Sequence, residues 1–551
     1  MSEKFLDVQL NRAVWVAMIE QDKIAEAVNL FEIYKKKLMN INSKEAKDEL
    51  KYSYDILVEK FIAKAEEYVK NKDYTQALIC YKYIYEADNK NEENIKKYIM
   101  CLDKSKQHDL QLRLAKRLIK LNENSANYKI LSSACDKNDD FKSAIKFYNK
   151  HLFLLKKKRL DANDNNALGC FYFNSYVKKG QNPEDAEMAL SYFRKAVAEV
   201  KDNKAFLKNT IVAAMKAKDY KVEKKCWDSY IKYGYMDGEE EFTYCASCMR
   251  NGDIKEWAKH YGSRFGKTEP TIYPQFDKPE WTGKEDISDK TLLIHYEQGY
   301  GDNFLMFGYM PRLVKKAKKV IYYIQNNAYD LVKNNEFGVE IYCQKTKDLK
   351  EIEFDYHLPS MSIPIALDLD KDTLSVGGGY IKPNEKEVEK YRKKYFDNDK
   401  FKIGFAFLGV NLNQKRDIPF EHLLQLDKLN NVELYCFSKD VDDKLLQKFK
   451  RNKVVNIAKD FETFADTANA LQNVDILISS DNGVLNLAGA IGKKTLGIFN
   501  YHYEFRWYDL TGEDCGWFNC IKPIVNNAYN DWSISMKTAI EEVKKEMKNK
   551  A

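Results

Sequence analysis

Hydrophobic positions recur at helical spacing from Arg12 to about residue 265, and one phrase repeats within this stretch. Each copy has a polar turn with an aspartate, after which small and aromatic residues follow at helical spacing. The copies begin at Asp73, Asp140, Asp185 and Asp219. The first two lie 67 residues apart and the last two lie 34 apart, so the period is about 34 residues. This periodicity predicts stacked helical hairpins over residues 1–265, with a degenerate pattern between residues 100 and 135.

One helical hairpin cannot bury its own apolar stripe, whereas stacked hairpins bury each other's stripes and form a superhelix with a concave face. Small residues such as Ala77 and Ala144 let the helices approach closely, and Tyr81 and Phe147 fill the space between repeats. The region resembles tetratricopeptide repeats in irregular form. Such an array implies a groove for a peptide or a protein partner.

The hydrophobic period changes after residues 266–288, a segment that holds three of the 10 prolines. We interpret this segment as a linker that is ordered by Tyr273, Phe276 and Trp281. Helices are expected beyond it at 303–316 and 328–334, and a charged helix at 383–398. Short apolar runs predict strands at 291–294, 320–324, 339–342, 402–407, 432–437, 454–457, 474–479 and 495–499.

Alternating strands and helices predict parallel, doubly wound sheets. The charged helix separates two Rossmann-like halves, 289–385 and 386–551, which we expect to face each other across a cleft. The predicted fold class is therefore α + α/β, a helical solenoid followed by two Rossmann-like domains. Ligands bind such sheets beyond the carboxyl ends of the strands.

Composition narrows the class of protein. Of 551 residues only 23 are glycine and 10 are proline, which favours long helices and excludes collagen-like and low-complexity chains. The net charge of +7, from 90 basic and 83 acidic residues, is spread along the chain. Short basic runs such as Lys156–Lys158 are expected to be solvated. Without a clustered basic face, nucleic-acid binding is not expected.

We expect a cytoplasmic protein, because the chain shows no apolar signal segment and no apolar run long enough to span a membrane. Its 11 cysteines are scattered, and only Cys245 and Cys248 form a C-x-x-C pair. These two are either reduced core thiols or a metal or redox pair. No second pair follows them at zinc spacing.

The first motif with chemistry follows the strand at 291–294 and reads EQGYGD over residues 297–302. Its two glycines allow a tight turn close to a ligand. Asp302 lies where the next helix begins, so it is either a helix cap or a general base that faces the cleft. The motif is not G-x-G-x-x-G, so a nicotinamide enzyme fits poorly.

A second motif, Ser480, Asp481, Asn482 and Gly483, opens a helix after the strand at 474–479. Backbone N–H groups at such a helix start suit a diphosphate. Asp481 is again either a cap or a ligand.

Two basic motifs also follow strands in the second half. Lys415 and Arg416 are either phosphate ligands or part of a solvated loop. Arg506, after the strand at 495–499, either meets leaving-group charge or belongs to a structural ion pair.

Together these motifs resemble bacterial proteins in which tetratricopeptide repeats precede a glycosyltransferase module related to the lipopolysaccharide heptosyltransferases. That module is of the GT-B type, with two Rossmann-like halves. The resemblance covers nearly all of residues 291–545, and its segments stand in the family's order. They are EQGYGDNFLMFGYMPRL (297–313), FDYHLPSMSIPIAL (354–367), KRDIPF (415–420), FADTANALQNVDILISSDNGVLNLAGAIGK (464–493) and FRWY (505–508). The layout is also similar to that of the eukaryotic O-GlcNAc transferase.

The resemblance implies a role for the first motif. Asp302 would be the general base that deprotonates the acceptor hydroxyl. The loop residues near the acceptor, on the same half, would be Glu297, Gln298, Gly299 and Gly301.

The resemblance also implies a donor site on residues 386–551. The donor-binding residues would be Lys415, Arg416, Ser480, Asp481, Asn482, Gly483, Asn486 and Arg506. Side chains and a helix end would carry the phosphate charge, so neither a metal nor another cofactor is implied. Relatives have His where this chain has Asn486, and Asn can donate a hydrogen bond to phosphate but cannot carry a charge. The module is therefore either active with weaker leaving-group stabilisation or degenerate.

These features predict a glycosyltransferase that moves a sugar from a nucleotide-diphosphate donor to a Ser or Thr hydroxyl of a protein. The repeat array would select that acceptor, with flagellin or a surface protein as the family analogue. Two alternatives stay open: a repeat scaffold with a degenerate sugar-nucleotide module, and a heptosyltransferase-like enzyme with a glycan or lipid acceptor. A homo-oligomer formed through the array is compatible with each of them.

Overall fold

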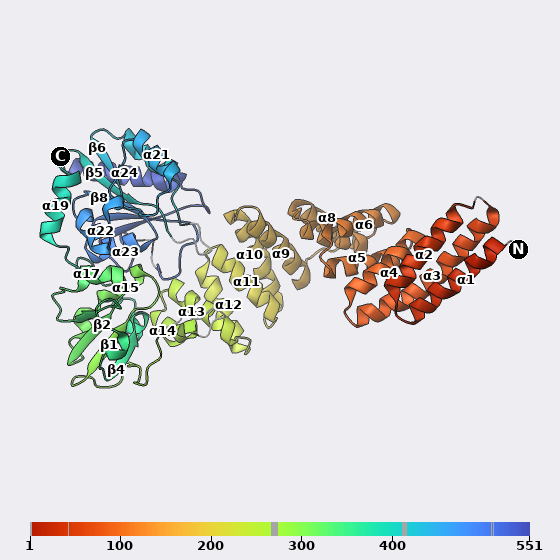
Figure 1. The fold of residues 1–551 in the computed structure, drawn as a ribbon, viewed down its shortest axis with the longest axis horizontal. Coiled ribbons are helices and arrows are strands. Elements are labelled where there is room, and N and C mark those ends of the chain that lie inside the picture. The colour runs from red at the N-terminus through yellow and green to blue at the C-terminus, as the bar shows by residue number, and fades with distance from the viewer. Residues whose placement is uncertain are drawn as a thin grey trace. The chain divides into compact units, whose positions relative to one another are not determined.

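The computed structural model describes residues 3–41, 43–265, 274–409, 416–508, 510 and 512–550, with side chains from Arg12 onward. The chain divides into two compact units, Met1–Lys179 and Gly180–Ala551. Figure 1 shows the first unit in red to brown and the second in yellow to blue. The first unit is helical in its described part, and the second combines helices with two parallel sheets.

The first unit is built from antiparallel helices that pack on their sequence neighbours. Asp73 and Asp140 cap α4 and α8, because their side chains accept hydrogen bonds from the N–H groups of Gln76 and Ser143. The two aspartates thus lie in turns as predicted, and they also cap the helices that follow. The helices are α1 (Glu3–Glu20), α2 (Ile24–Met39), α3 (Lys44–Lys70), α4 (Tyr74–Ala87), α5 (Glu92–Lys104), α6 (His108–Leu121), α7 (Ser125–Lys137), α8 (Phe141–Leu154) and α9 (Ala162–Lys178).

The repeat also continues through the stretch whose sequence pattern is degenerate. Lys72, Lys106 and Asp139 each adopt a positive φ near 60° in the turn between two helices, and they lie 34 and 33 residues apart. In the middle copy the cap position is Gln107, whose side chain makes no capping bond. The aspartate that marks the other copies is therefore missing from the sequence there, although the turn is present.

The helical array extends into the second unit. Its helices are α10 (Pro183–Glu199), α11 (Lys204–Lys216), α12 (Tyr220–Lys232), α13 (Gly238–Arg250) and α14 (Ile254–His260), followed by the 3-10 helix η1 (Tyr261–Phe265). Asp219 lies in the predicted turn and caps α12. Asp185 does not cap α10: it lies in the first turn, and the cap is Asn182, followed by Pro183. Cys245 and Cys248 on α13 are buried thiols that form no disulfide.

Two parallel sheets follow. In the first, the strand order is β3-β2-β1-β4, and in the second it is β10-β9-β8-β5-β6-β7. The first sheet comprises β1 (Thr291–His295), β2 (Lys319–Tyr323), β3 (Glu340–Tyr342) and β4 (Tyr356–Pro359). The second comprises β5 (Phe401–Ala406), β6 (Val432–Cys436), β7 (Val455–Asn456), β8 (Ile476–Ser480), β9 (Thr495–Phe499) and β10 (Ile521–Val525). The strand order in each sheet reverses beside its first strand, at β1/β4 and at β5/β8, where doubly wound sheets bind ligands.

Helices connect the strands of both sheets (Figure 1). Those of the first half are α15 (Tyr300–Phe307), α16 (Met310–Leu313), α17 (Asn326–Val332), η2 (Leu349–Glu351), η3 (Ser360–Ser362) and α18 (Ile363–Ala366). Those of the second are α19 (Glu385–Tyr395), α20 (Phe420–Leu423), η4 (Leu424–Lys428), α21 (Asp443–Arg451), η5 (Ala458–Asp460), α22 (Phe464–Leu471), α23 (Gly483–Ala490) and α24 (Ser533–Lys550).

The structure differs from the sequence-based expectation at three elements. The helix expected at 303–316 is two short helices, α15 and α16. They separate at Gly308, and Pro311, which has no N–H to donate, opens the second one. Strands β4 and β10 were not predicted, since each is short and contains a proline, Pro359 or Pro523.

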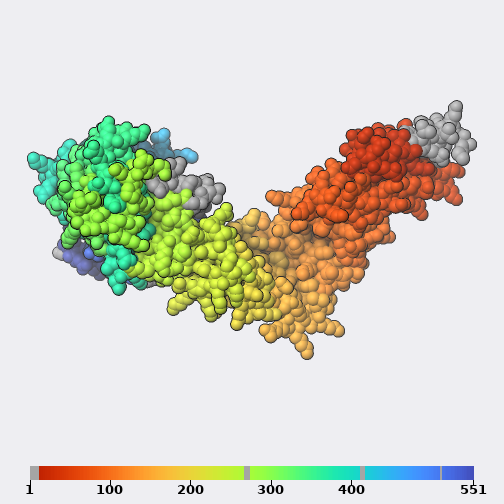
Figure 2. All heavy atoms as spheres, turned by 90° about the horizontal axis from the view of Figure 1, so that it is seen from below, coloured from red at the N-terminus to blue at the C-terminus, as the bar shows by residue number. Residues whose placement is uncertain are grey.

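The end of the helical array and the sheets share one hydrophobic core, which explains why the boundary between the units falls at residue 179 and not near 265. Trp227 and Trp257 from the array belong to the same buried cluster as Leu292 of β1. Phe242 of α13 packs edge-on against Phe505, with ring centroids 5.6 Å apart. Figure 2 shows the yellow-green array helices and the green first half as one continuous surface.

The predicted linker is partly outside the described residues, which resume at 274, so Tyr273 lies outside them. Phe276 packs on His357, with ring centroids 4.7 Å apart, and Trp281 is buried. Both aromatic side chains thus order the linker as expected. None of the helices in the described residues has the length and apolarity needed to cross a bilayer.

Candidate active site

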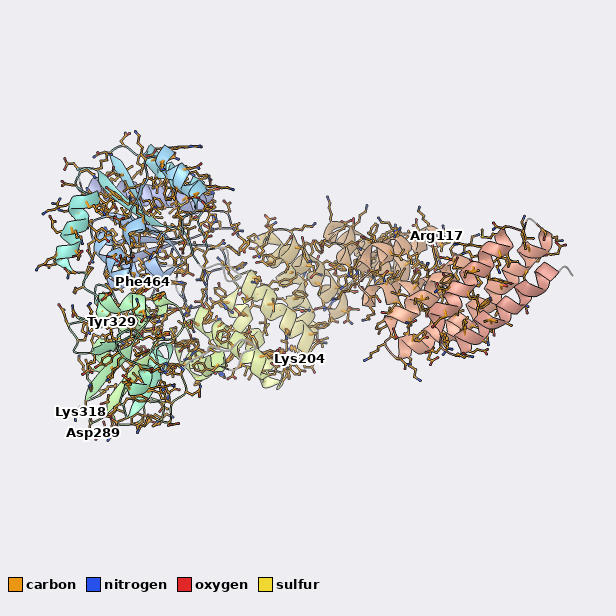
Figure 3. All side chains as sticks on the ribbon, viewed as in Figure 1. Arg117, Lys204, Asp289, Lys318, Tyr329 and Phe464 are labelled. Atoms are coloured by element: carbon orange, nitrogen blue, oxygen red, sulfur yellow. The ribbon has the colours of Figure 1, made fainter. Side chains whose placement is uncertain are left out.

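A cavity of about 1060 Å³ lies between the two sheet-bearing halves. The first half contributes the loop that follows β1 and the start of α15. The second contributes the loops after β5, β6 and β9 and the first turns of α22 and α23. The cavity therefore opens at the carboxyl ends of strands from both sheets, as expected for this fold class. In Figure 3, Tyr329 of α17 and Phe464 of α22 mark the facing halves.

The two halves approach most closely where α15 meets α23. A Cβ at Gly301 would lie 2.7 Å from Nδ2 of Asn486, so a side chain at that position would force Asn486 to move. Phe464 packs on Tyr300 and Phe304 of α15, with ring centroids 4.8 and 5.0 Å away. The glycine of the EQGYGD motif thus serves the approach of the two helices, and it brings Asn486 to the cavity wall.

Asp302 faces this cavity from the first turn of α15. Its Oδ2 accepts a hydrogen bond from the N–H of Gly299 at 3.0 Å, and its Oδ1 pairs with the guanidinium of Arg506. Burial raises the pKa of Asp302, while Arg506 opposes that shift. One oxygen thus helps to cap the start of α15, as the first interpretation expected, and the other points at the opposite half. A role as general base stays a prediction.

Arg506 bridges the two halves. Its side chain donates to Oε1 of Gln298 at 2.9 Å and to Oε2 of Glu504 at 2.8 Å, besides pairing with Asp302. Burial works against its charge, but the two carboxylates hold the pKa of Arg506 well above its ordinary value. Trp517 donates its indole N–H to the carbonyl of Arg506 and so positions this loop. The structural ion pair considered for Arg506 is present, and the same side chain lines the cavity.

Gln298, Gly299 and Gly301 line the cavity, but Glu297 is not in its wall. That this loop lies near an acceptor stays a prediction. The carboxylate of Glu297 is fully buried against Arg264 of η1, with Nε and NH2 at 2.7 and 3.0 Å from its two oxygens. Sequence reasoning missed Arg264, because nothing local marks a pair that is 33 residues apart. Glu297 therefore ties the loop to the helical array and does not contact the cavity.

At the start of α23, a side chain of the protein itself bonds N–H groups that were predicted to bind a diphosphate. Asn482 is the helix cap, and its Oδ1 accepts from the N–H groups of Val484 and Leu485 at 2.9 and 3.1 Å. Two of the donors expected to bind phosphate are thus already satisfied. Ser480 is fully buried, where its Oγ accepts from Asn482, and it is not in the cavity wall.

Asp481 lies in the cavity wall with Gly483, although it is not the helix cap. Its Oδ1 accepts from the indole N–H of Trp507 at 3.0 Å, and its Oδ2 is 3.5 Å from Arg416. Burial raises the pKa of Asp481, and Arg416 opposes the shift. An acceptor-only carboxylate suits ligand hydroxyls better than phosphate oxygens.

Three basic side chains among the described residues line the cavity: Arg416, Lys439 and Arg506. Lys415, predicted as a phosphate ligand, lies outside the described residues. Lys439 was not predicted, although it follows β6 directly and strand ends of this sheet carry the other site residues. No group of three or more His, Cys, Asp or Glu that could hold a metal occurs in the described part of the chain.

A smaller cavity of about 300 Å³ adjoins the main one on the first half and shares Tyr300 and Asn327 with it. Its other lining includes Tyr296, Gln325 and Lys345, at the ends of β1, β2 and β3. Amide and tyrosine side chains therefore line much of this smaller cavity.

No family model matches the chain, and no curated protein matches it either. Solved structures do. A glycosyltransferase family 9 protein of Veillonella parvula is 12% identical with a TM-score of 0.37, over 48% of this chain and 98% of its own. The E. coli ADP-heptose lipopolysaccharide heptosyltransferase II is 12% identical with a TM-score of 0.37, over 47% of this chain and 100% of its own.

Helical proteins match as well. YrrB, described as a TPR protein with an unusual peptide-binding site, is 14% identical with a TM-score of 0.25, over 32% of this chain and 84% of its own. MamA is 18% identical with a TM-score of 0.27, over 33% of this chain and 96% of its own. At such identities the chemistry of the site has to carry a functional proposal.

Proposed function

We propose that this protein is a glycosyltransferase of the GT-B type. It transfers a sugar from a nucleotide-diphosphate sugar, bound in the cavity, to a Ser or Thr hydroxyl of a protein held by the helical array. The observation that carries the proposal is the position of Asp302, a partly buried carboxylate on one half that pairs with Arg506 of the other half in the wall of a cavity of about 1060 Å³. A base on one side and cations on the other match the needs of glycosyl transfer.

In the reaction, Asp302 accepts the proton of the acceptor hydroxyl. The hydroxyl oxygen forms a bond to the anomeric carbon, and the bond from that carbon to the phosphate oxygen breaks. The electron pair of that bond leaves on the nucleotide diphosphate. Arg416, Lys439 and Arg506 are the cations in the described cavity wall that balance its charge. Neither a metal nor another cofactor is part of the proposal.

Because Asp302 is paired with Arg506, binding of the donor should also change the basicity of Asp302. A carboxylate whose charge is compensated by a guanidinium is a weaker base than a free one. The donor diphosphate competes for the guanidinium of Arg506, so its arrival releases Oδ1 of Asp302 for the acceptor proton. Asn486, at the meeting point of α15 and α23, contributes a neutral hydrogen-bond donor where relatives have an ionisable His.

The acceptor is assigned to the helical array because stacked hairpins expose an extended surface suited to a polypeptide. Flagellin or a surface protein is the acceptor class that the family analogy supports, and a cytoplasmic enzyme would modify it before export. The alternative is a repeat scaffold with an inactive module. It is favoured by one observation, that Asn482 already satisfies two of the helix-start donors.

The test compares Asp302→Asn with the wild type in two assays, donor turnover with candidate acceptor proteins and binding of nucleotide diphosphates. We expect transfer to fall by 10²-fold or more while nucleotide binding stays within a few-fold, because the amide cannot accept the proton. Asp289→Asn is the matched control: Asp289 is exposed before β1 (Figure 3) and should leave both assays unchanged. Equal transfer by the Asp302→Asn variant would refute the base assignment. Nucleotide binding without transfer by the wild type would favour the scaffold.

A further inference from the structure

The end of α8 in the first unit presents three consecutive apolar side chains to solvent. Phe153 is 73% exposed, Leu154 37% and Leu155 51%. Among the described residues this is the only run of three large apolar side chains exposed to that degree. The buried side of the same helix end holds His151 and Leu152, so the exposed residues are the outward side of a well-packed helix.

Basic residues surround these apolar side chains. Lys156, Lys158 and Arg159 follow directly and are exposed, and the ammonium of Lys150 lies 5.6 Å from the ring centroid of Phe153. None of these four cations has a carboxylate partner among the described residues. Lys156 and Lys158 are exposed, as predicted for a solvated run, and they follow the exposed apolar residues directly in the chain.

A backbone hydrogen bond closes the turn that follows α8. Lys156 adopts a φ of 52°, and its N–H donates to the carbonyl of Phe153 at 3.0 Å. Lys157 is different from its neighbours, because it pairs with Asp161 and Asp164 at the start of α9. Lys157 thus compensates one of these two negative charges, and neither carboxylate forms an ion pair with the other four cations.

One more acidic group lies at this end of the helices. Ser125, which opens α7, has its Oγ 2.6 Å from Nδ1 of His151, so the turn before α7 reaches the same end as the tip of α8. That turn contributes Glu123, which accepts a hydrogen bond from the hydroxyl of Tyr128. With Lys157 and its two partners included, five cations face three carboxylates at this tip, so the surface has a net charge of about +2.

We propose that this tip, Phe153–Leu155 with Lys150, Lys156, Lys158 and Arg159, docks the protein on the surface of an anionic lipid bilayer. The apolar side chains enter the boundary between headgroups and acyl chains, and the cations bind the anionic headgroups. A bilayer surface offers both environments, an apolar boundary and anionic headgroups, next to each other. A protein partner would need an acidic and apolar socket of matching shape, whereas a fluid bilayer adapts to a protruding tip. The attachment is peripheral and independent of the glycosyl-transfer proposal.

The experiment is vesicle flotation of the full chain with vesicles of phosphatidylcholine alone or with 30% phosphatidylglycerol. We expect binding to the anionic vesicles at low and moderate salt, weakening as salt rises, and little binding to phosphatidylcholine alone. Each basic residue contributes about a fivefold increase in partitioning. Lys156→Glu/Lys158→Glu should therefore lower partitioning by at least about 25-fold.

A second variant, Phe153→Ser/Leu155→Ser, tests the apolar side chains. It should lower partitioning onto the anionic vesicles by about tenfold or more. The matched controls are Ile33→Ser/Met39→Ser, whose apolar side chains on α2 are 54% and 66% exposed, and Lys47→Glu/Lys51→Glu on α3. Circular dichroism checks that all variants keep the wild-type helix content.

Three results would overturn the proposal. The first is no binding to anionic vesicles, and the second is equal loss in the control variants and the tip variants. The third is unchanged binding by Phe153→Ser/Leu155→Ser, which would leave only nonspecific charge attraction. Binding of the chain to poly-glutamate but not to vesicles would assign the surface to an acidic protein instead.

Discussion

Replacing Arg264 with alanine should destabilise the second unit by about 3–5 kcal/mol, the usual cost of removing one partner of a buried ion pair. The guanidinium of Arg264 is 2% exposed and the carboxylate of Glu297 is fully buried. Arg264 also donates to the hydroxyl of Ser362 at 2.8 Å and to the carbonyl of Tyr261 at 3.0 Å. Its removal leaves a buried carboxylate with no compensating charge, which is why the expected cost is far above that of a surface pair.

The size of the thermal shift follows from the size of the unit. Unfolding entropy of about 2.1 cal/mol/K per residue gives about 0.8 kcal/mol/K for the second unit, Gly180–Ala551. A loss of about 4 kcal/mol therefore lowers its Tm by about 5 °C. Because Glu297 begins the loop that carries Asp302, the loss should also loosen the cavity wall.

The assay is differential scanning calorimetry of the full chain, with two matched variants. Arg392→Ala removes an exposed pair with Glu389 and should cost less than about 1 kcal/mol. The double variant Arg264→Met/Glu297→Leu removes both charges and should regain most of the lost stability. A loss below about 1 kcal/mol in Arg264→Ala, or a double variant no more stable than the single one, would refute the reasoning.

Two further predictions concern stability. Burial lowers the pKa of His295 to about 3. Between pH 6.5 and pH 3 the unfolded chain therefore binds a proton at this residue that the folded chain does not. The free energy of unfolding consequently falls as the pH drops through this window. Denaturant unfolding at pH 7, 5 and 4 should show a shallower fall for His295→Asn, and an identical pH dependence would contradict the account. Gly301→Ala should cost about 1–3 kcal/mol, because its Cβ would lie 2.7 Å from Nδ2 of Asn486, and a variant as stable as the wild type would mean that α15 and α23 are not in such close contact.

Most of the sheet could be predicted from the sequence because its strands are buried apolar runs. β1, β8 and β9 each contain a short run of Leu, Ile or Phe and are almost wholly buried, as expected of parallel strands covered on both faces. β4 has one aliphatic residue, Leu358, and the apolar residues of β10 are interrupted by Lys522 and Pro523, so neither strand stands out from a loop. Their places in the sheets come from pairing with β1 and β9, which is tertiary information.

The positions of the site residues could be predicted better than their contacts. Asp302 and Asp481 both line the cavity, since the carboxyl end of a strand is recognisable from its apolar run. The partners could not be predicted: Arg506 is 204 residues from Asp302, and Trp507 is 26 from Asp481. Ser480 was misplaced because a small polar residue at a strand end gives no sign of whether it faces the ligand or the core.

In the helical array too, only some of the turns could be predicted from the sequence. Asp73, Asp140 and Asp219 mark their turns because a capping carboxylate leaves a trace in the sequence. The turn before Gln107 has the same backbone without that trace. A sequence motif based on the capping aspartate therefore does not detect repeats whose turns are stabilised by packing alone.

Binding of nucleotide diphosphates and nucleotide sugars, measured by calorimetry and by the shift in Tm without added metal, tests the central claim most directly. The account predicts that at least one nucleotide diphosphate binds the wild type and raises the stability of the second unit, by about 2.7 kcal/mol at a concentration of 100 Kd. It also predicts that Arg416→Gln, which removes a cation from the cavity wall, weakens this binding by tenfold or more while the exposed Arg392→Gln does not. No stabilisation by any of these nucleotides, or equal binding by Arg416→Gln, would contradict a donor site in this cavity.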